Sequence, residues 1–262
     1  MSGALGGAGV GLVAMLLVNP ATAEETRMTL VPGGVYASFV KVKPLGRTAP
    51  AKPESVAVAP FRLDVTPVTN GEFLAFVDRN PEWRRSQIKS LFVDAHYLRR
   101  WVDDLHLADE AARDEPVTNV SWFAGRAYCK AQGKRLPTTA EWEYALLDAG
   151  RGQGVVRQVS LEWFSRPNAR RPGPVGQGQA NGFGLRDMVG LLWEWTLDFE
   201  ASAMSAESQD PNGKDNAAFC GGAAAGVTDA TDYPAFMRFS LRASLKAGDT
   251  ADNLGFRCAQ DP

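Results

Sequence analysis

The chain has 262 residues, with 28 basic and 30 acidic side chains and a formal net charge of −2 at pH 7. No block of lysine or arginine interrupts this balance, so the sequence offers no electrostatic basis for binding nucleic acid or an anionic membrane. The 26 glycines and 16 prolines are spread along the chain and predict many turns. This length suits one large, irregular domain.

Residues 1–23 contain no charged side chain and end in Ala-Thr-Ala, directly before Glu24. An apolar run followed by such a small-x-small site is typical of a secretory signal peptide, although the positively charged start is missing. A transmembrane anchor is the alternative, but the glycines leave an apolar core that is short for a bilayer span. We therefore expect a cleaved signal peptide, one exported domain over residues 24–262, and no membrane attachment after cleavage.

Two stretches, 29–39 and 55–70, contain alternating apolar residues and predict one strand each, with a Pro-rich polar loop between them. Thr69 and Glu72 then stand at the spacing of a capping box, in which a hydroxyl and a carboxylate satisfy each other's backbone N–H groups. A helix with Phe73 on its apolar face is expected to begin there.

The stretch Pro-Val-Thr-Asn-Val-Ser that begins at residue 116 leads into two further helices. Ser121 suits the N-cap of the first, whose apolar face is expected to include Phe123. Gly133 provides the left-handed residue that ends it. Thr138 and Glu141 repeat the capping-box spacing, so a second helix is expected to start almost at once.

The segments around these helices look polar or irregular. Both histidines, His96 and His106, lie in the charged segment 80–115, ten residues apart in the sequence. Metal sites need several converging ligands, and neither HxH nor HxxxH spacing occurs, so we expect both imidazoles to be solvated. Residues 151–188 are rich in glycine and proline and predict a loop-rich segment.

Three ordered motifs carry a family resemblance: AYCKAQGKRLPTTAEWEYA at 127–145, NGFGLRDMVGLLWEWTLDF at 181–199 and NLGFRCA at 253–259. Together they closely resemble the formylglycine-generating-enzyme, or sulfatase-modifying factor, family. The resemblance implies an α+β fold of the formylglycine-generating-enzyme type, similar to C-type lectins and low in regular secondary structure.

The resemblance also implies a copper site that this sequence lacks. Active members convert the cysteine of a CxPxR sulfatase peptide to formylglycine, and they carry two cysteines after a Gly-Gly turn. These cysteines hold copper(I), a soft ion that suits thiolates. Here no cysteine occurs between Gly222 and Arg242. We therefore expect no copper bis-thiolate site and no formylglycine-generating oxidase activity, while other catalysis stays open.

The chain has 3 cysteines. Vertebrate members of the family bridge the positions that match Cys129 and Cys258, so the resemblance implies this disulfide. Cys220 is then left without a partner. A free cysteine is commonly a small buried hydrophobe, with a reactive or ligand role as the alternative.

Other metals receive less support from the resemblance. Relatives bind structural calcium through asparagine side chains and backbone carbonyls, which suit a hard cation. Asn168 matches one such asparagine, but Leu191 replaces another, so calcium is an open candidate at the first position alone. Iron-dependent relatives use three histidines, and this chain has 2.

The family's substrate cleft is expected between the Gly-Gly turn and the Trp-Glu-Trp stretch. The alternative role for the two tryptophans of that stretch is core packing. The alternative role for its glutamate is that of a buried hydrogen-bond hub. The candidate cleft residues are Phe219, Cys220, Gly221, Gly222, Trp193, Glu194 and Trp195.

The amino-acid sequences of the motifs resemble those of the NirV subgroup, which is encoded beside copper nitrite reductases in denitrifying bacteria. This resemblance implies a periplasmic, non-oxidase accessory protein that binds copper nitrite reductase or its electron-supply proteins. Two alternatives remain open. One is an enzyme of different chemistry, similar to the pyoverdine-maturation branch, and the other is a regulator in a type VI secretion kinase pathway.

Overall fold

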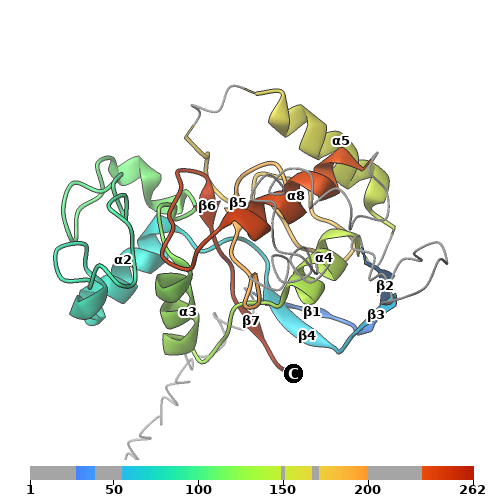
Figure 1. Ribbon diagram of the computed structural model, residues 1–262, viewed down its shortest axis with the longest axis horizontal. Coiled ribbons are helices and arrows are strands. Elements are labelled where there is room, and N and C mark those ends of the chain that lie inside the picture. The colour runs from blue at the N-terminus through green and yellow to red at the C-terminus, as the bar shows by residue number, and fades with distance from the viewer. Residues whose placement is uncertain (1–27, 39–54, 149–150, 167–170, 200–231) are drawn as a thin grey trace, which may run out of the picture.

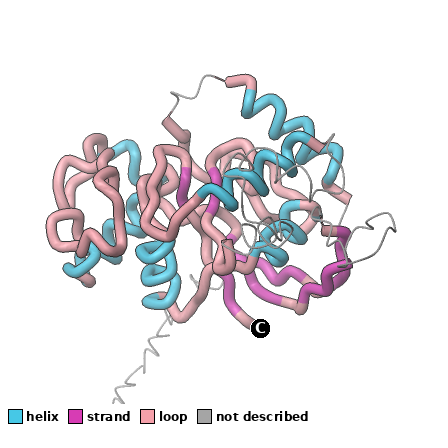
Figure 2. The backbone as a smooth tube through the Cα atoms, viewed as in Figure 1, coloured by secondary structure: helices cyan, strands magenta, loops and turns pink. Residues whose placement is uncertain are grey.

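The computed structural model describes residues 28–38, 55–148, 151–166, 171–199 and 232–262, so the expected signal peptide lies outside the described part. Short helices and strands are separated by long loops (Figure 2), which confirms an α+β fold with modest regular secondary structure. No helix within the described ranges is long and apolar enough to cross a membrane. The main elements are β1 (Met28–Val31), β2 (Gly34–Ala37), β3 (Ser55–Val58), β4 (Phe61–Asp64), α2 (Asn70–Arg79), α3 (Trp122–Ala131), α4 (Thr139–Leu146), α5 (Gln153–Phe164), β5 (Trp193–Glu194), α8 (Tyr233–Ser244), β6 (Leu254–Gly255) and β7 (Ala259–Gln260).

β4 is the central strand of a three-stranded antiparallel sheet with the order β1-β4-β7. Met28 lies opposite Asp64, and Leu63 lies opposite Ala259, so this sheet joins the two ends of the described chain. β2 and β3 form a second antiparallel pair, and β5 pairs with β6 in parallel. Figure 1 shows β1 to β4 at the lower right and the β5–β6 pair near the centre.

Each of the two strands expected in the N-terminal region is in fact a pair of short strands. Pro32 and Pro60 interrupt them, because proline has no N–H to donate to a sheet. Gly33 lies at the break, where the two antiparallel segments approach closely, and a Cβ atom there would come within 2.7 Å of the Val58 carbonyl oxygen. The prolines and this close approach divide the alternating pattern between two sheets.

The three capped helices begin where the sequence predicts. Thr69 and Thr138 cap α2 and α4, and both capping boxes are complete. The Ser121 hydroxyl accepts a hydrogen bond from the Ala124 N–H at the start of α3. Gly133, with φ of +69°, follows the end of α3, which is the conformation expected of a glycine in this position.

The buried face of α3 differs from the prediction, because Phe123 is only partly buried. The residues of α3 that face the core are Ala124, Gly125, Tyr128 and Cys129. Tyr128 stacks on Phe73 of α2, with ring centroids 5.8 Å apart. Gly125 lies against the ring of Phe256, which a Cβ atom would approach to 3.2 Å. This tight packing across the helix sets its orientation.

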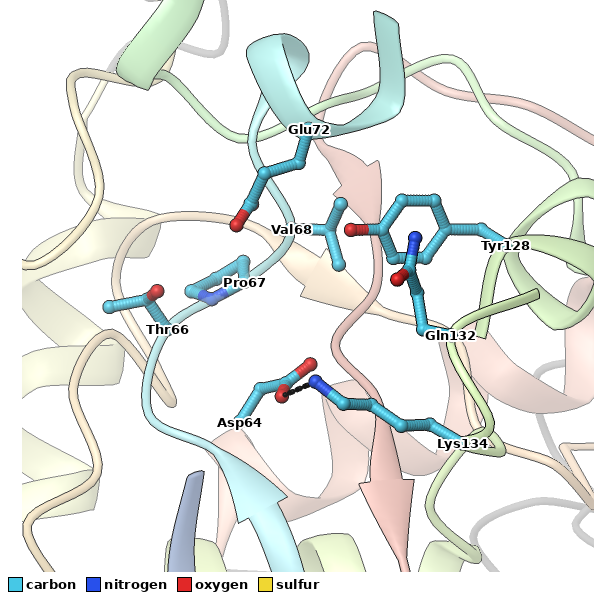
Figure 3. Close-up of a pocket in the computed structure, with 8 residues that line it drawn as sticks. All are labelled: Asp64, Thr66, Pro67, Val68, Glu72, Tyr128, Gln132 and Lys134. Carbon is cyan, nitrogen blue, oxygen red and sulfur yellow. Dashed lines mark hydrogen bonds and ion pairs between the residues drawn. The ribbon is translucent and has the colours of Figure 1, made fainter. Parts of the chain in front are cut away.

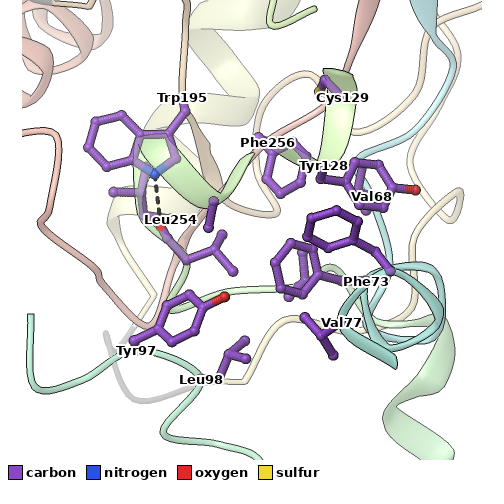
Figure 4. Packing of buried hydrophobic residues seen from close by; sticks show 14 of the residues in the cluster. Val68, Phe73, Val77, Tyr97, Leu98, Tyr128, Cys129, Trp195, Leu254 and Phe256 are labelled. Carbon is purple, nitrogen blue, oxygen red and sulfur yellow. Dashed lines mark hydrogen bonds between the residues drawn. The ribbon is translucent and has the colours of Figure 1, made fainter. Parts of the chain in front are cut away.

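The disulfide lies in this core (Figure 4). Cys129 and Cys258 are bonded, as the family resemblance implied, and both residues are fully buried. Rings from α2, α3 and the C-terminal segment belong to the same cluster, and Phe73 lies 6.1 Å from Phe256 by ring centroids. The bridge therefore ties α3 to the C-terminal segment within one large aromatic cluster.

A helix occupies part of the segment that was expected to be loop-rich. α5 buries Val156 and Ser160, and it packs beside α8 at the upper right of Figure 1. Phe164, at the end of α5, meets Tyr233, at the start of α8, with ring centroids 6.0 Å apart. These two helix ends bring aromatic side chains to one surface.

Candidate functional site

A cleft of about 720 Å³ opens where α5, β5 and α8 meet. Trp163 and Phe164 come from the end of α5, Trp193 comes from β5, and Tyr233 and Met237 come from α8. Arginine, aspartate and asparagine residues also line the cleft. We call this cavity the aromatic cleft; its remaining lining residues are Arg166, Arg171, Pro172, Gly173, Gly190, Leu191, Asp252 and Asn253.

The rings in the aromatic cleft form a continuous wall. Trp193 lies 4.7 Å from Trp163 and 5.8 Å from Phe164 by ring centroids, and it is stacked on Phe164. Tyr233 extends the wall from Phe164 and is 49% exposed. The rings are tilted against one another, by 50° between Trp163 and Trp193 and by 89° between Phe164 and Tyr233, so the wall offers an uneven aromatic surface. Such a surface suits an apolar or aromatic group of a ligand.

The Trp-Glu-Trp stretch does not reach the cleft as a unit. Trp193 lines the cleft, whereas the side chains of Glu194 and Trp195 are buried in the interior. Trp195 is 1% exposed, and its Nε1–H donates to the Val120 carbonyl oxygen at 2.9 Å. The assignment of Glu194 and Trp195 to the cleft therefore needs correction, because both side chains are buried and hydrogen-bonded inside the protein.

Glu194 is a buried hydrogen-bond hub. Its carboxylate accepts from Nε and Nη2 of Arg257, both at 2.8 Å, and from Trp142 Nε1 at 2.9 Å. Arg257 is itself fully buried and donates to further backbone carbonyls. Both Glu194 oxygens are therefore engaged, and Leu191 has no side-chain oxygen. These two positions do not fit a calcium ion.

α8 is held beneath the cleft by a charge cluster. Glu143 of α4 binds Arg238 in a two-point contact, at 3.1 and 3.0 Å, and accepts a third hydrogen bond from Arg242 at 2.6 Å. Burial raises the pKa of Glu143, but the two guanidinium groups outweigh that effect and lower the pKa to about 2. This cluster fixes the helix that carries Tyr233 and Met237.

A smaller pocket of about 50 Å³ lies between β4, α2 and α3 (Figure 3). Lys134 Nζ donates to Asp64 Oδ1 at 2.9 Å, and the other Asp64 oxygen accepts from the Cys258 N–H. Burial raises the pKa of Asp64 and is opposed by Lys134. The pocket has room for a few water molecules. The aromatic cleft is therefore the better candidate for a functional site.

The histidines lie away from both pockets. His106 Nδ1 lies 2.9 Å from Asp103 Oδ1, and the His106 side chain is 73% exposed. His96 is also exposed, beside Asp94. Across the described residues, no group of three or more His, Cys, Asp or Glu side chains could hold a metal.

Comparison with known proteins identifies the family. Residues 15–262 match the model of the sulfatase-modifying factor enzyme 1-like domain. The chain belongs to the sulfatase-modifying factor family. A formylglycine-generating enzyme from Streptomyces coelicolor is 31% identical to it over 300 residues, which cover 93% of each chain. An inactive C-alpha-formylglycine-generating enzyme 2 from Bos taurus is 30% identical over 285 residues, covering 90% of this chain and 88% of the relative.

A solved structure supports the fold of this sulfatase-modifying factor domain. The structure of PvdO from Pseudomonas aeruginosa aligns with a TM-score of 0.54 and 20% identity, covering 90% of this chain and 94% of PvdO. At this level of identity the likeness concerns the fold alone.

Several residues expected at the sulfatase-modifying factor site lie outside the described part of the chain. They are Phe219, Cys220, Gly221 and Gly222 of the cleft, and Asn168 of the calcium candidate. Conversely, sequence reasoning missed Trp163, Phe164 and Tyr233. A signal was present, because the buried Val156 and Ser160 precede Trp163 and Phe164 at helical spacing.

Proposed function

We propose that this protein is an exported, periplasmic member of the family that binds a protein partner through the aromatic cleft and does not generate formylglycine. The disulfide is the observation that supports the absence of formylglycine generation. Cys129 and Cys258 are bonded to each other, so Cys220 is the one remaining cysteine of 3 in the chain. A two-thiolate copper site needs two free cysteines, and one thiol cannot supply it.

The form of the aromatic cleft supports binding. Its volume of about 720 Å³ falls in the usual range for ligand sites, and it combines an apolar wall with a few polar groups. Tryptophan and tyrosine are also the residues that dominate binding energy at protein interfaces. One of the relatives carries the name of an inactive enzyme, which supports retention of this fold without the oxidase reaction.

The proposed partner is the copper nitrite reductase of a denitrifying bacterium, or a protein that supplies its electrons. Two features of the sequence support this choice of partner. The motifs resemble those of the subgroup encoded beside that enzyme, and residues 1–23 resemble a signal peptide. Contacts would come from Trp193 and Tyr233, and residues 219–222, which lie outside the described part of the chain, are further candidates. This binding gives the aromatic cleft a role without any reaction of its own.

A deletion strain of the source organism tests this proposal. Nitrite consumption, the copper occupancy of nitrite reductase and denitrifying growth are measured with three complementing genes: wild type, Trp193→Ala, and Leu91→Ala as a control. Leu91 is 77% exposed and does not line the aromatic cleft. We expect deletion to lower at least nitrite consumption, with rescue by wild type and Leu91→Ala but not by Trp193→Ala. Normal values of all three quantities in the deletion strain would refute the proposed role.

A further inference from the structure

A second cavity adjoins the aromatic cleft. Its volume is about 370 Å³, and it lies between the segment around Arg99 and Arg100 and the start of α2. Arg171 and Pro172 line both cavities, and Asp252, which lines the aromatic cleft, is bound by Arg99 and Arg100 of the second cavity. The two spaces are therefore neighbouring parts of one surface. We call the second cavity the arginine pocket.

The charges in the arginine pocket are unevenly paired. Arg99 makes a two-point contact with Asp252, one bond of which is 2.8 Å from Nε to Oδ1. Arg100 reaches the same carboxylate through a single long contact, 3.4 Å from its Nε. Hydrogen bonds from Arg99 also lower the pKa of Asp252, so this carboxylate is ionised at neutral pH. Two guanidinium groups thus share one negative charge.

Arg100 has hydrogen-bond donors that are not used within the described part of the protein. Among the described residues, neither of its Nη atoms has a hydrogen-bond partner, and its side chain is 34% exposed. Arg171, by contrast, is held by Glu115 at 2.5 Å and by Asp109 at 3.3 Å. Arg100 is therefore the group in this pocket that is free to bind a further anion. A guanidinium with both terminal nitrogens free presents the fork that matches a carboxylate.

We propose that the arginine pocket binds a carboxylate of the partner, so that the partner presents an acidic peptide segment with an aromatic or large aliphatic residue beside the acid. The apolar side chain lies on the wall of Trp193 and Trp163, and the carboxylate lies on Arg100. This inference rests on the proposed function and names the chemistry of the partner.

Two observations favour an acidic peptide. Asp109 and Glu115 also line the pocket, so a doubly charged phosphate would meet repulsion that a single carboxylate meets less strongly. The two neighbouring cavities, of about 720 and 370 Å³, together exceed the usual size of a small-molecule site. An extended peptide can place one side chain in each cavity.

Phage display on the purified full chain tests the inference. Random dodecapeptides are selected on wild type, on Arg100→Gln, on Trp193→Ala, and on Arg157→Gln as a control, since Arg157 is exposed and lines neither cavity. Thermal unfolding confirms that each variant is folded. On wild type and Arg157→Gln we expect enrichment of peptides that combine an aromatic or large aliphatic residue with Asp or Glu. On Arg100→Gln the apolar preference should persist and the acidic preference should disappear.

The affinity of an enriched peptide gives the second readout. Arg100→Gln should weaken it by about tenfold, the value of one charge-assisted hydrogen-bonded contact. Changing the peptide's acid to its amide should weaken binding to wild type equally and binding to Arg100→Gln hardly at all. Enrichment of apolar residues without acids, or equal affinities for wild type and Arg100→Gln, would overturn the arginine-pocket inference alone. If the selected peptides do not depend on Trp193, the proposed role of the aromatic cleft is overturned as well.

Discussion

Replacing Glu143 by glutamine is expected to lower the free energy of unfolding by about 3–5 kcal/mol, because it removes the carboxylate that pairs with two largely buried arginines. The side chains of Arg238 and Arg242 are 5% and 8% exposed. Among the described residues, Arg238 Nη1 already lacks a hydrogen-bond partner, and no second carboxylate pairs with Arg238 or Arg242 in place of Glu143. Urea denaturation at neutral pH measures this loss.

The same carboxylate gives the stability a pH dependence. Its pKa is about 2 in the folded chain, against 4.5 for an ordinary glutamate. Because the folded-state pKa is lowered, the contribution is complete above pH 4.5 and is lost as the pH falls toward 2. The difference corresponds to about 3 kcal/mol. The stability gap between wild type and Glu143→Gln should therefore narrow over this pH range, and a gap that stays constant would contradict the assignment.

Loss of the disulfide is the second large effect. The bridge spans 129 residues of sequence, and closing a loop of this length in the unfolded chain stabilises the fold by about 4–5 kcal/mol. We expect Cys129→Ser or Cys258→Ser to lower the free energy of unfolding by about this amount, measured by urea denaturation of the oxidised protein.

Cys220→Ser is the matched control for the disulfide, because it removes the cysteine that has no partner left in the chain. It should change the free energy of unfolding much less. Peptide mapping without reductant should find Cys129 linked to Cys258 and one free thiol at Cys220. A peptide that linked Cys220 to either of the other two would contradict the pairing.

The features that sequence reasoning predicted well are local. A capping box depends on residues three apart, so Thr69 and Thr138 mark the starts of α2 and α4 without knowledge of the fold. The disulfide was predicted differently, from the resemblance to relatives. The break between β1 and β2 was missed, although Pro32 is visible in the sequence, because the apolar alternation continues on both sides of it.

The candidate site was harder to predict because it is assembled from distant parts of the chain. Phe164 and Tyr233 meet through the packing of α5 on α8, across an interval that no short motif spans. Glycines at 152 and 154 around the start of α5 favoured a loop, and the tertiary packing of Val156 overrides them. The direction of Trp193 depends on its pairing with Leu254 in a strand of two residues, which periodicity does not reveal.

We propose that this chain retains the family fold without the formylglycine-generating reaction. Incubation with a CxPxR sulfatase peptide, copper and oxygen, followed by mass measurement of the peptide cysteine, tests this most directly. The formylglycine-generating enzyme from Streptomyces coelicolor, 31% identical to this chain, serves as the positive control. We expect the control to convert the cysteine and this protein to leave it unchanged. A formylglycine product formed by this protein would contradict the claim.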